Sequence, residues 1–250
     1  MTVRFLCGVV ALAGVLLAQP LGAAAPDASL DVLRTRITAL ATTAGAEVAV
    51  VYQPIGGGTG LRLNEDLSFH AASTMKVPVM IELFRQARAG RFSLDDQVPV
   101  VNVFHSIVDG SPFSLDVTAE SERVLFPLLG RSASYRQLCE VMITVSSNFA
   151  TNLLLEHLGA PAVQATADAL GAKGMRVLRG VEDQKAFDRG MNNATTARAL
   201  ATLFEAMASG LTVDRPSSDA MLAILERQQF NEGIPAGLPD GLAVAHKTGE

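Results

Sequence analysis

The sequence is poor in residues that hold metals, form disulfides or build large aromatic surfaces: it has two cysteines, four histidines and no tryptophan among 250 residues. Cys7 lies in an N-terminal apolar run, so removal of that run would leave Cys139 alone and exclude a disulfide within the chain. The histidines are scattered, and no HExxH or paired cysteine and histidine spacing predicts a metal site. The net charge of −5 is spread without acidic or basic blocks, which gives no reason to expect a nucleic-acid partner. We therefore expect no metal and no other cofactor.

The N-terminus has the order of a secretory signal peptide, with Arg4 before an apolar run from Phe5 to Ala18 and then a stretch of small residues. Cleavage after Ala24 fits best, because cleavage one residue later would place Pro26 first in the mature chain. The alternative is an uncleaved membrane anchor, but the run is shorter than the about 20 residues that a span needs. We predict a signal peptide at 1–24, export to the periplasm or the medium, and no stable membrane span after cleavage.

The whole chain is 49% hydrophobic, and residues 25–250 are enough for one domain with a sizeable core. Apolar spacing predicts an amphipathic helix over 29–43, strands over 47–52 and 61–64, and a late strand over 242–248. The spacing predicts further helices over 73–89, 134–145, 148–157, 162–170, 195–208 and 218–228, with a polar loop over 179–193. Two early strands, a helical block and a late strand indicate an α+β fold with helices packed on an antiparallel sheet.

The predicted sheet would be small and would have an open edge, because it contains only two early strands and one late strand. The sequence stops at Glu250, directly after the late strand. We therefore expect it to be a C-terminally truncated fragment.

The first chemical motif is Ser73-Thr74-Met75-Lys76, an S-x-x-K pattern at the start of a predicted helix. Residues three apart lie on one helix face, so the Lys76 amine can reach the Ser73 hydroxyl. A serine hydroxyl is a weak nucleophile until a neighbouring base takes its proton, and a lysine can be that base only if its surroundings lower its pKa. The helix start also offers a backbone N–H to an oxyanion. Taken alone, the motif fits a helix-capping serine and a surface lysine equally well.

Two further motifs favour the chemical interpretation. Ser146-Ser147-Asn148 lies between two predicted helices, where a hydroxyl and a carboxamide could project into a cleft. Lys247-Thr248-Gly249 lies on the predicted late strand, where the glycine would leave room for a substrate. The chain has only four lysines, and two of them, Lys76 and Lys247, fall on motif positions.

Together these motifs resemble the signature of class A β-lactamase-like serine hydrolases, the penicillin-recognising serine enzymes. The resemblance extends to MITVSSNFATNLLL at 142–155 and NNATTA at 192–197, and it covers the chain from about Leu30 to Glu250. It implies an antiparallel sheet with packed helices, together with an all-helical subdomain. Compared with the family fold, this sequence would lack two C-terminal strands and a helix. We also expect a monomer with a small-molecule substrate, a β-lactam or a cell-wall peptide, and a catalytic domain over 25–250.

The resemblance implies a role for each motif residue. Ser73 would be acylated, Lys76 would take or relay its proton, and Ser146 would pass a proton to the leaving nitrogen. Asn148 would bind the substrate's amide side chain, and Lys247 and Thr248 would bind its carboxylate. Gly249 and Glu250 complete the implied substrate-binding residues, and the backbone N–H of Glu250 would be the second oxyanion donor.

The sequence departs from the family pattern in two places. The middle residue of the second motif is Ser147 instead of the aspartate that braces the local backbone. In the loop after Arg179, Glu182 stands where a glutamate would activate the water that releases the acyl group, but Ala186 replaces the expected asparagine and the spacing is one residue longer. Glu182 and Asp183 could instead be solvated loop carboxylates.

Three functions remain open at this point: opening of β-lactam amides, a D-alanyl-D-alanine peptidase or esterase activity at the same site, and covalent binding of β-lactams with poor release. Glu182 is the residue that divides them. His70 and His246 each lie beside a motif, but no G-x-S-x-G elbow accompanies them, so we expect both to be structural.

Overall fold

The computed structural model describes residues 26–116, 118 and 123–250. The predicted signal peptide therefore lies outside the described residues, and its removal stays a prediction. Within the described part, none of the helices combines the length and the apolar character needed to cross a membrane.

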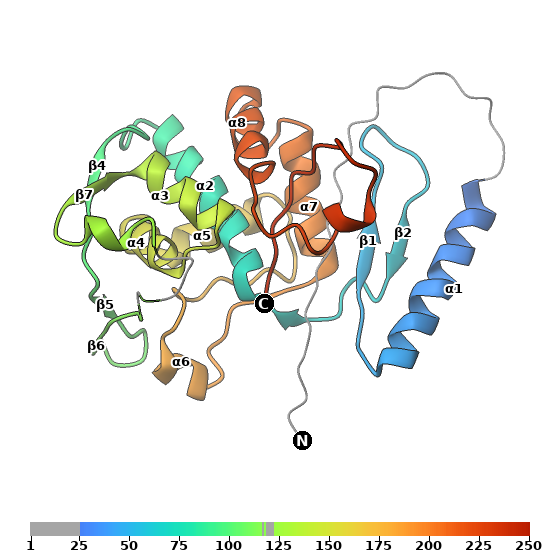
Figure 1. Ribbon diagram of the computed structural model, residues 1–250, viewed down its shortest axis with the longest axis horizontal. Coiled ribbons are helices and arrows are strands. Elements are labelled where there is room, and N and C mark those ends of the chain that lie inside the picture. Colours follow the sequence, from blue (N-terminus) through green and yellow to red (C-terminus); the bar gives the residue numbers. More distant parts are fainter. Residues whose placement is uncertain (1–25, 117, 119–122) are drawn as a thin grey trace.

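Helices form the body of the fold around α2 (Lys76–Arg88), in which ten of thirteen residues are buried. A helix buried on nearly all sides belongs at the centre of a packed layer, and α2 packs on α4 (Asn148–Leu158) and α5 (Ala160–Ala169). The helices α3 (Tyr135–Thr144), α7 (Ala197–Ala208) and α8 (Arg215–Leu225) close the same core (Figure 1). The predicted helices of this block are confirmed, with ends that differ by a few residues.

The strands form small antiparallel pairs among the described residues. These are β1 (Val50–Tyr52) with β2 (Leu61–Leu63), β3 (Phe69–His70) with β8 (Ala194–Thr195), β4 (Gln97–Pro99) with β7 (Ser132–Ser134), and β5 (Phe104–His105) with β6 (Pro112–Phe113). Helices packed with small antiparallel sheets confirm the α+β class.

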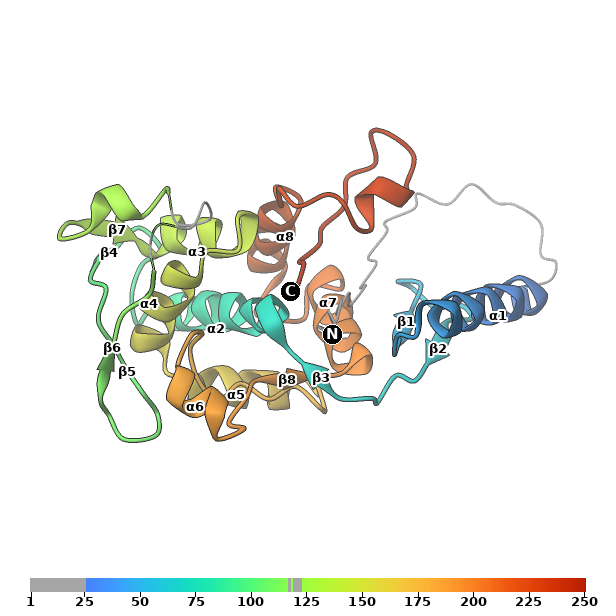
Figure 2. The same ribbon diagram turned by 60° about the horizontal axis from the view of Figure 1, so that its bottom comes forward.

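The predicted late strand over 242–248 is wrong: this segment has no strand pairing in the described structure. A strand is defined by its ladder of backbone hydrogen bonds. In this stretch Leu242 N–H instead donates to the Pro239 carbonyl in a turn, and His246 N–H donates to the carbonyl of Leu225 at the end of α8, both at 3.4 Å. The segment is extended but packs against helices, and it carries the chain end to the start of α2 (Figures 1 and 2).

The N-terminal helix α1 (Pro26–Ala44) lies at one end of the molecule beside β2 (Figure 2). Its predicted apolar stripe is present but little covered, with Leu33 42% and Leu40 70% exposed. The pair β1–β2 is joined to the body through a small apolar cluster in which Val51 packs with Ala197 of α7.

The segment over 179–193 is not the plain loop that its polarity predicts, because it contains the short helix α6 (Gln184–Asp188). Asp183 caps this helix by accepting a hydrogen bond from Ala186 N–H at 3.1 Å. We call residues 179–193 the loop segment. Short 3-10 turns lie at η1 (Ala72–Met75), η3 (Phe126–Leu128) and η4 (Pro235–Gly237).

Candidate active site

The Ser73 turn is a fixed and strained piece of backbone. Ser73 lies in η1, directly before α2, and the preceding Ala72 has a left-handed φ of 44°. For a residue with a Cβ this conformation costs roughly 1–2 kcal/mol. The turn is held by Thr74, whose N–H and hydroxyl both donate to the Ala71 carbonyl at 3.0 and 2.5 Å, and by Ala71 N–H, which donates to the Asn193 carbonyl at 3.0 Å. Strain held in this way is common where a side chain must be presented to a ligand.

Lys76 is fully buried, and its amine faces Ser73 as the three-residue spacing predicts. Its Nζ lies 3.0 Å from Ser73 Oγ, 2.8 Å from Asn148 Oδ1, and 2.5 and 3.1 Å from the carbonyl oxygen and Oγ of Ser146. An ammonium has three hydrogens for these four oxygens. A neutral amine has two hydrogens and one lone pair, so in that state the Ser73 hydroxyl can donate to the nitrogen.

Ser146 bridges the two lysines. Its Oγ lies 3.1 Å from Lys76 Nζ and 3.0 Å from Lys247 Nζ, so a proton could pass between these groups through one hydroxyl. Like Ala72, Ser146 has a left-handed backbone, with φ 58°. The hydroxyl thus sits at the meeting point of three segments that are far apart in the sequence.

Ser147 braces the backbone at the position where the family has an aspartate. It is fully buried and caps α4, accepting a hydrogen bond from Ala150 N–H at 3.0 Å. Its own N–H donates to the Val141 carbonyl at 3.1 Å, and its carbonyl accepts from Thr151 Oγ1 at 2.7 Å. A neutral hydroxyl is therefore sufficient to hold the joint between α3 and α4 that presents Ser146 and Asn148.

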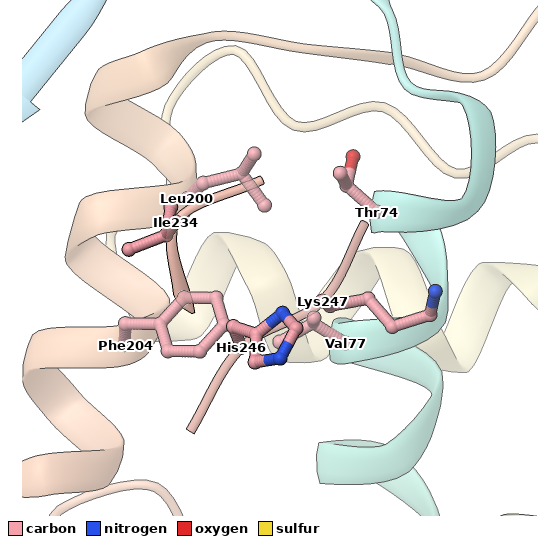
Figure 3. A pocket seen from close by; sticks show the side chains of 7 residues that line it. All are labelled: Thr74, Val77, Leu200, Phe204, Ile234, His246 and Lys247. Atoms are coloured by element: carbon pink, nitrogen blue, oxygen red, sulfur yellow. The ribbon is translucent and has the colours of Figure 1, made fainter. Parts of the chain in front are cut away.

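Lys247 reaches the site from the extended C-terminal segment. Figure 3 shows its side chain running toward α2, while His246 lies beside Phe204 of α7. Burial lowers the pKa of Lys247 from its usual 10.5 to about 7. Burial, and next the neighbouring Lys247, lowers the pKa of His246, whose Nε2 contacts Asn231 Oδ1 at 3.1 Å.

Gly249 packs against the Ser73 turn. A Cβ added to Gly249 would lie 2.9 Å from Thr74 Cγ2 and 3.4 Å from Thr74 N. The absence of a side chain therefore lets the C-terminal segment approach the Ser73 turn. Thr248, which precedes it, lies with its carbonyl oxygen 2.9 Å and its Oγ1 3.5 Å from Lys247 Nζ.

Ser73 opens onto a cavity of 210 Å³ that is lined by residues from several of the predicted motifs. Ser73, Asn148, Glu182 and Glu250 all line it. His70 also lines it, but its Nδ1 accepts the Ala72 N–H at 3.1 Å, so the ring helps to hold the turn. Burial, followed by the charge of Arg179, lowers the pKa of His70.

Glu182 faces this cavity. Its Oε1 accepts a hydrogen bond from Asn148 Nδ2 at 2.7 Å, and the same carboxamide accepts from Lys76 through Oδ1. The chain of contacts therefore runs from Glu182 through Asn148 to Lys76 and Ser73. Glu182 is exposed and has a left-handed φ of 62°, so its backbone needs external support.

Asn152 provides support on one side of Glu182. Its carboxamide donates to the Val181 carbonyl at 3.0 Å and accepts from Val181 N–H at 2.7 Å. Gly180 makes this approach possible, because a Cβ there would overlap Asn152 Oδ1. We call this pair of hydrogen bonds the Asn152 clamp.

The structure also shows functional neighbours that the motifs did not identify. Arg179 is buried and bonds to the Met191 and Gly180 carbonyls and to Asn192 Oδ1, each at 2.9 Å, so it closes the loop segment on itself. Asp183 is buried, whereas Glu182 is exposed, so the interpretation of both as solvated carboxylates is wrong for Asp183. Asn152 could have been found in the sequence, since it lies four residues after Asn148 and on the same helix face.

The chain resembles known proteins in sequence. The family model of the Beta-lactamase enzyme family matches residues 32–250. Beta-lactamase AST-1 of Nocardia asteroides is 30% identical over 217 residues, covering 86% of this chain and 66% of that protein. A beta-lactamase of Rhodobacter capsulatus is 29% identical over 135 residues, covering 54% of this chain and 42% of that protein. The chain thus spans just under two thirds of the length of the first of these curated relatives and less than half of the second.

Solved structures share the fold. A beta-lactamase from Sphaerobacter thermophilus matches with a TM-score of 0.71 and 28% identity, over 87% of this chain and 77% of that chain. A variant of PBP-A, solved as an acyl-enzyme complex with penicillin G, matches with a TM-score of 0.71 and 27% identity, over 88% and 78%. The TLA-3 extended-spectrum beta-lactamase matches in fold with a TM-score of 0.74 at 21% identity, over 88% and 78%.

The chain therefore belongs to the Beta-lactamase enzyme family and has the α+β fold of class A β-lactamases.

Proposed function

We propose that this protein opens β-lactam amides through an acyl-enzyme on Ser73 and releases the product with water. The observation that carries the proposal is the placement of two sets of groups around one cavity: Ser73 with Lys76 and Ser146 on one side, and Glu182 on the other. The first set is what acylation needs, and the second is what release needs.

In the acylation step, neutral Lys76 takes the Ser73 proton across the 3.0 Å contact while Oγ attacks the lactam carbonyl. The carbonyl oxygen gains negative charge, and the backbone N–H groups of Ser73 and Glu250 are the proposed donors to it. The C–N bond then breaks, and Ser146 passes a proton to the leaving nitrogen. Ser146 can be reprotonated from either lysine, because its hydroxyl contacts both.

Substrate binding uses the remaining groups. The Asn148 carboxamide would bond to the amide side chain of the substrate, and Lys247 with Thr248 would hold the substrate carboxylate. Gly249 allows this segment to lie against the Ser73 turn, so the carboxylate site and the nucleophile have a fixed separation.

In the release step, Glu182 takes a proton from a water as the water oxygen bonds to the acyl carbonyl. The bond from that carbonyl to Ser73 Oγ then breaks, and Oγ regains the proton that Glu182 took, so that Glu182 ends ionised again. The contact between Glu182 and Asn148 supports this role, because it holds the carboxylate toward the cavity that Ser73 lines. A solvated carboxylate pointing away from the site would favour covalent binding without release.

The test is a time course with a chromogenic cephalosporin, followed by intact-mass measurement. We expect steady turnover, an adduct that appears transiently, and neither event in Ser73→Ala. Ser132→Ala, at an exposed serine in β7, is the matched control and should behave as the wild type. A burst of one equivalent with a lasting adduct would show a covalent binder, turnover of a D-alanyl-D-alanine peptide alone would show a peptidase, and a reactive Ser73→Ala would refute the nucleophile.

We also propose that the protein acts after export, on the basis of the N-terminal sequence pattern alone. N-terminal sequencing of the protein expressed from its full reading frame should give a chain that begins at Ala25. An intact Met1 on membrane-bound protein would instead show an uncleaved anchor.

A further inference from the structure

Asp183 is a buried carboxylate that follows Glu182 directly in the chain. It is 2% exposed and has no ion pair within 4 Å among the described residues. Three neutral donors hold it: Ser106 Oγ at 2.9 Å and Ala186 N–H at 3.1 Å on Oδ1, and Ile107 N–H at 2.9 Å on Oδ2. Removing this side chain would leave three donors without their acceptor, two of them on another loop, which is costly for buried groups. The arrangement therefore fixes the position of Asp183.

Two of these donors belong to a different loop. Ser106 and Ile107 lie between β5 and β6, 77 and 76 residues before Asp183 in the chain. Ser106 is itself buried and fixed, since its N–H donates to the Ser111 carbonyl at 2.9 Å and its Oγ accepts from Val108 N–H at 3.2 Å. We call the hydrogen bonds from Ser106 and Ile107 to Asp183 the hairpin anchor.

The residues on both sides of Glu182, Val181 and Asp183, are each held by hydrogen bonds from another element. The Asn152 clamp holds Val181 from α4, and the hairpin anchor holds Asp183 from the β5–β6 loop. Between them, Glu182 keeps a left-handed φ of 62°, which an unsupported glutamate would leave for a lower-energy conformation. Fixing both neighbours restrains rotation of the Glu182 backbone more than fixing either neighbour alone.

We infer that Asp183 and Ser106 are positioning residues, which hold the Glu182 carboxylate toward Asn148 and Ser73 and so support release of the acyl group more than its formation. The inference rests on the proposed Ser73 acyl-enzyme. The groups proposed for acylation lie on η1, at the start of α2, on the joint before α4 and on the C-terminal segment. Neither hydrogen bond of the hairpin anchor reaches any of these elements. Loss of the anchor should therefore affect one step and not the other.

A second tie between the same two loops provides the matched control. Lys185 Nζ donates to Asp109 Oδ2 at 2.8 Å and to Ser111 Oγ at 2.7 Å, and both partners of this ion pair are about half exposed. An exposed pair contributes little because water competes for both charges. Lys185→Ala therefore breaks a contact between the same loops without removing the buried anchor.

The experiment measures acylation and release separately in wild type, Ser106→Ala, Asp183→Ala and Lys185→Ala, by intact-mass time courses with a chromogenic cephalosporin. Ser106→Ala removes one charge-assisted hydrogen bond and should slow release roughly tenfold. Asp183→Ala should slow it by about 10²-fold through displacement of Glu182. Acylation should stay within about threefold of wild type in both, so that the adduct accumulates, and Lys185→Ala should change neither step by more than about twofold.

Hydrogen exchange gives a readout that does not depend on catalysis. Ser106→Ala should raise amide exchange in a peptide that covers 178–190, whereas Lys185→Ala should not. Because Ser106→Ala removes only one hydroxyl, it keeps the test valid if Asp183→Ala fails to fold.

The outcomes separate the two proposals. If wild type forms no Ser73 adduct, the proposed function fails, and the exchange data alone report whether the anchor orders the loop segment. If wild type turns over but Ser106→Ala slows both steps equally, or neither, the positioning role is overturned while the Ser73 acyl-enzyme stands. If the wild-type protein is acylated but does not release the acyl group, Glu182 serves no step, and the positioning role is overturned as well.

Discussion

The two sides of the cavity at Ser73 are built differently. On the acylation side, Lys76 is fully buried on a central helix, and Ser146 and Lys247 contact one another directly. On the release side, Glu182 is exposed on a loop and depends on neighbours held from α4 and from the β5–β6 hairpin. Groups carried by packed helices need few supports, whereas a group carried by a loop keeps its place only through cross-links to other elements.

This difference indicates that the two steps should respond to different substitutions. Changes on the acylation side should act on the chemistry directly. Changes on the release side can act at a distance, through the anchors of a backbone that would otherwise relax.

The largest expected effect comes from Lys76→Met, which replaces the buried amine by an apolar chain of similar length. Acylation should slow by roughly 10²–10⁴-fold, because Ser73 loses the group that takes its proton. Single-turnover kinetics with a chromogenic cephalosporin measure this rate. Lys173→Met, at an exposed lysine outside the cavity lining, is the control and should acylate at the wild-type rate.

Two glycines allow a matched comparison of the two sides, because a single methyl group can be added to each. Gly180→Ala would push Asn152 away and open the clamp on Val181, so release should slow by about 10²-fold with little change in acylation. Gly249→Ala would press on Thr74 and the Ser73 turn, so acylation should slow instead. The pair is measured by the same mass time course, and a reversal of the two patterns would refute the division into sides.

The site residues differ in how far sequence could predict them. Ser73, Lys76, Ser146 and Lys247 fall in short motifs whose spacing defines their geometry on a helix or at a joint, and the structure brings them within hydrogen-bond reach of one another as expected. Ser106 and Asp183 are 77 residues apart in the chain, with no spacing rule between them. Their contact follows from the packing of two loops, which local patterns do not specify.

The fold shows the same limit. Helices with a clear apolar period were predicted within a few residues, because that period depends on local sequence alone. The stretch over 242–248 is extended and apolar, as a strand would be, but it lies on helices without a pairing strand in the described structure. A β-strand needs a second strand to pair with, and the sequence of one segment does not show whether such a strand lies beside it.

A smaller effect is expected from pH, through the lowered pKa of Lys247 at about 7. The ammonium is present below this pH and is lost as the pH rises through it, so KM for a carboxylate-bearing substrate should rise about tenfold between pH 6 and pH 8. Substrate with an esterified carboxylate, assayed in parallel, should show a flat KM. A flat KM for both substrates would mean that Lys247 does not hold the carboxylate.

The lowered pKa of Lys247 also affects stability: substrate binding should weaken as the pH rises, whereas the folded state should become more stable. Between pH 7 and 10.5 the unfolded chain binds the Lys247 proton and the folded chain does not, so the free energy of unfolding should rise with pH over this range. Lys247→Met should lose this contribution when chemical denaturation is compared at pH 7 and pH 9.

The central claim is that Ser73 is acylated and that Glu182 releases the acyl group, and a mass time course of Glu182→Gln against wild type tests it most directly. Glutamine keeps the size and the acceptor oxygen but cannot take a proton, so release should slow by roughly 10²–10⁴-fold while acylation continues. The account predicts a persistent adduct of one equivalent that maps to Ser73 in the variant and only a transient one in wild type. Turnover of Glu182→Gln at the wild-type rate, or an adduct on another residue, would contradict it.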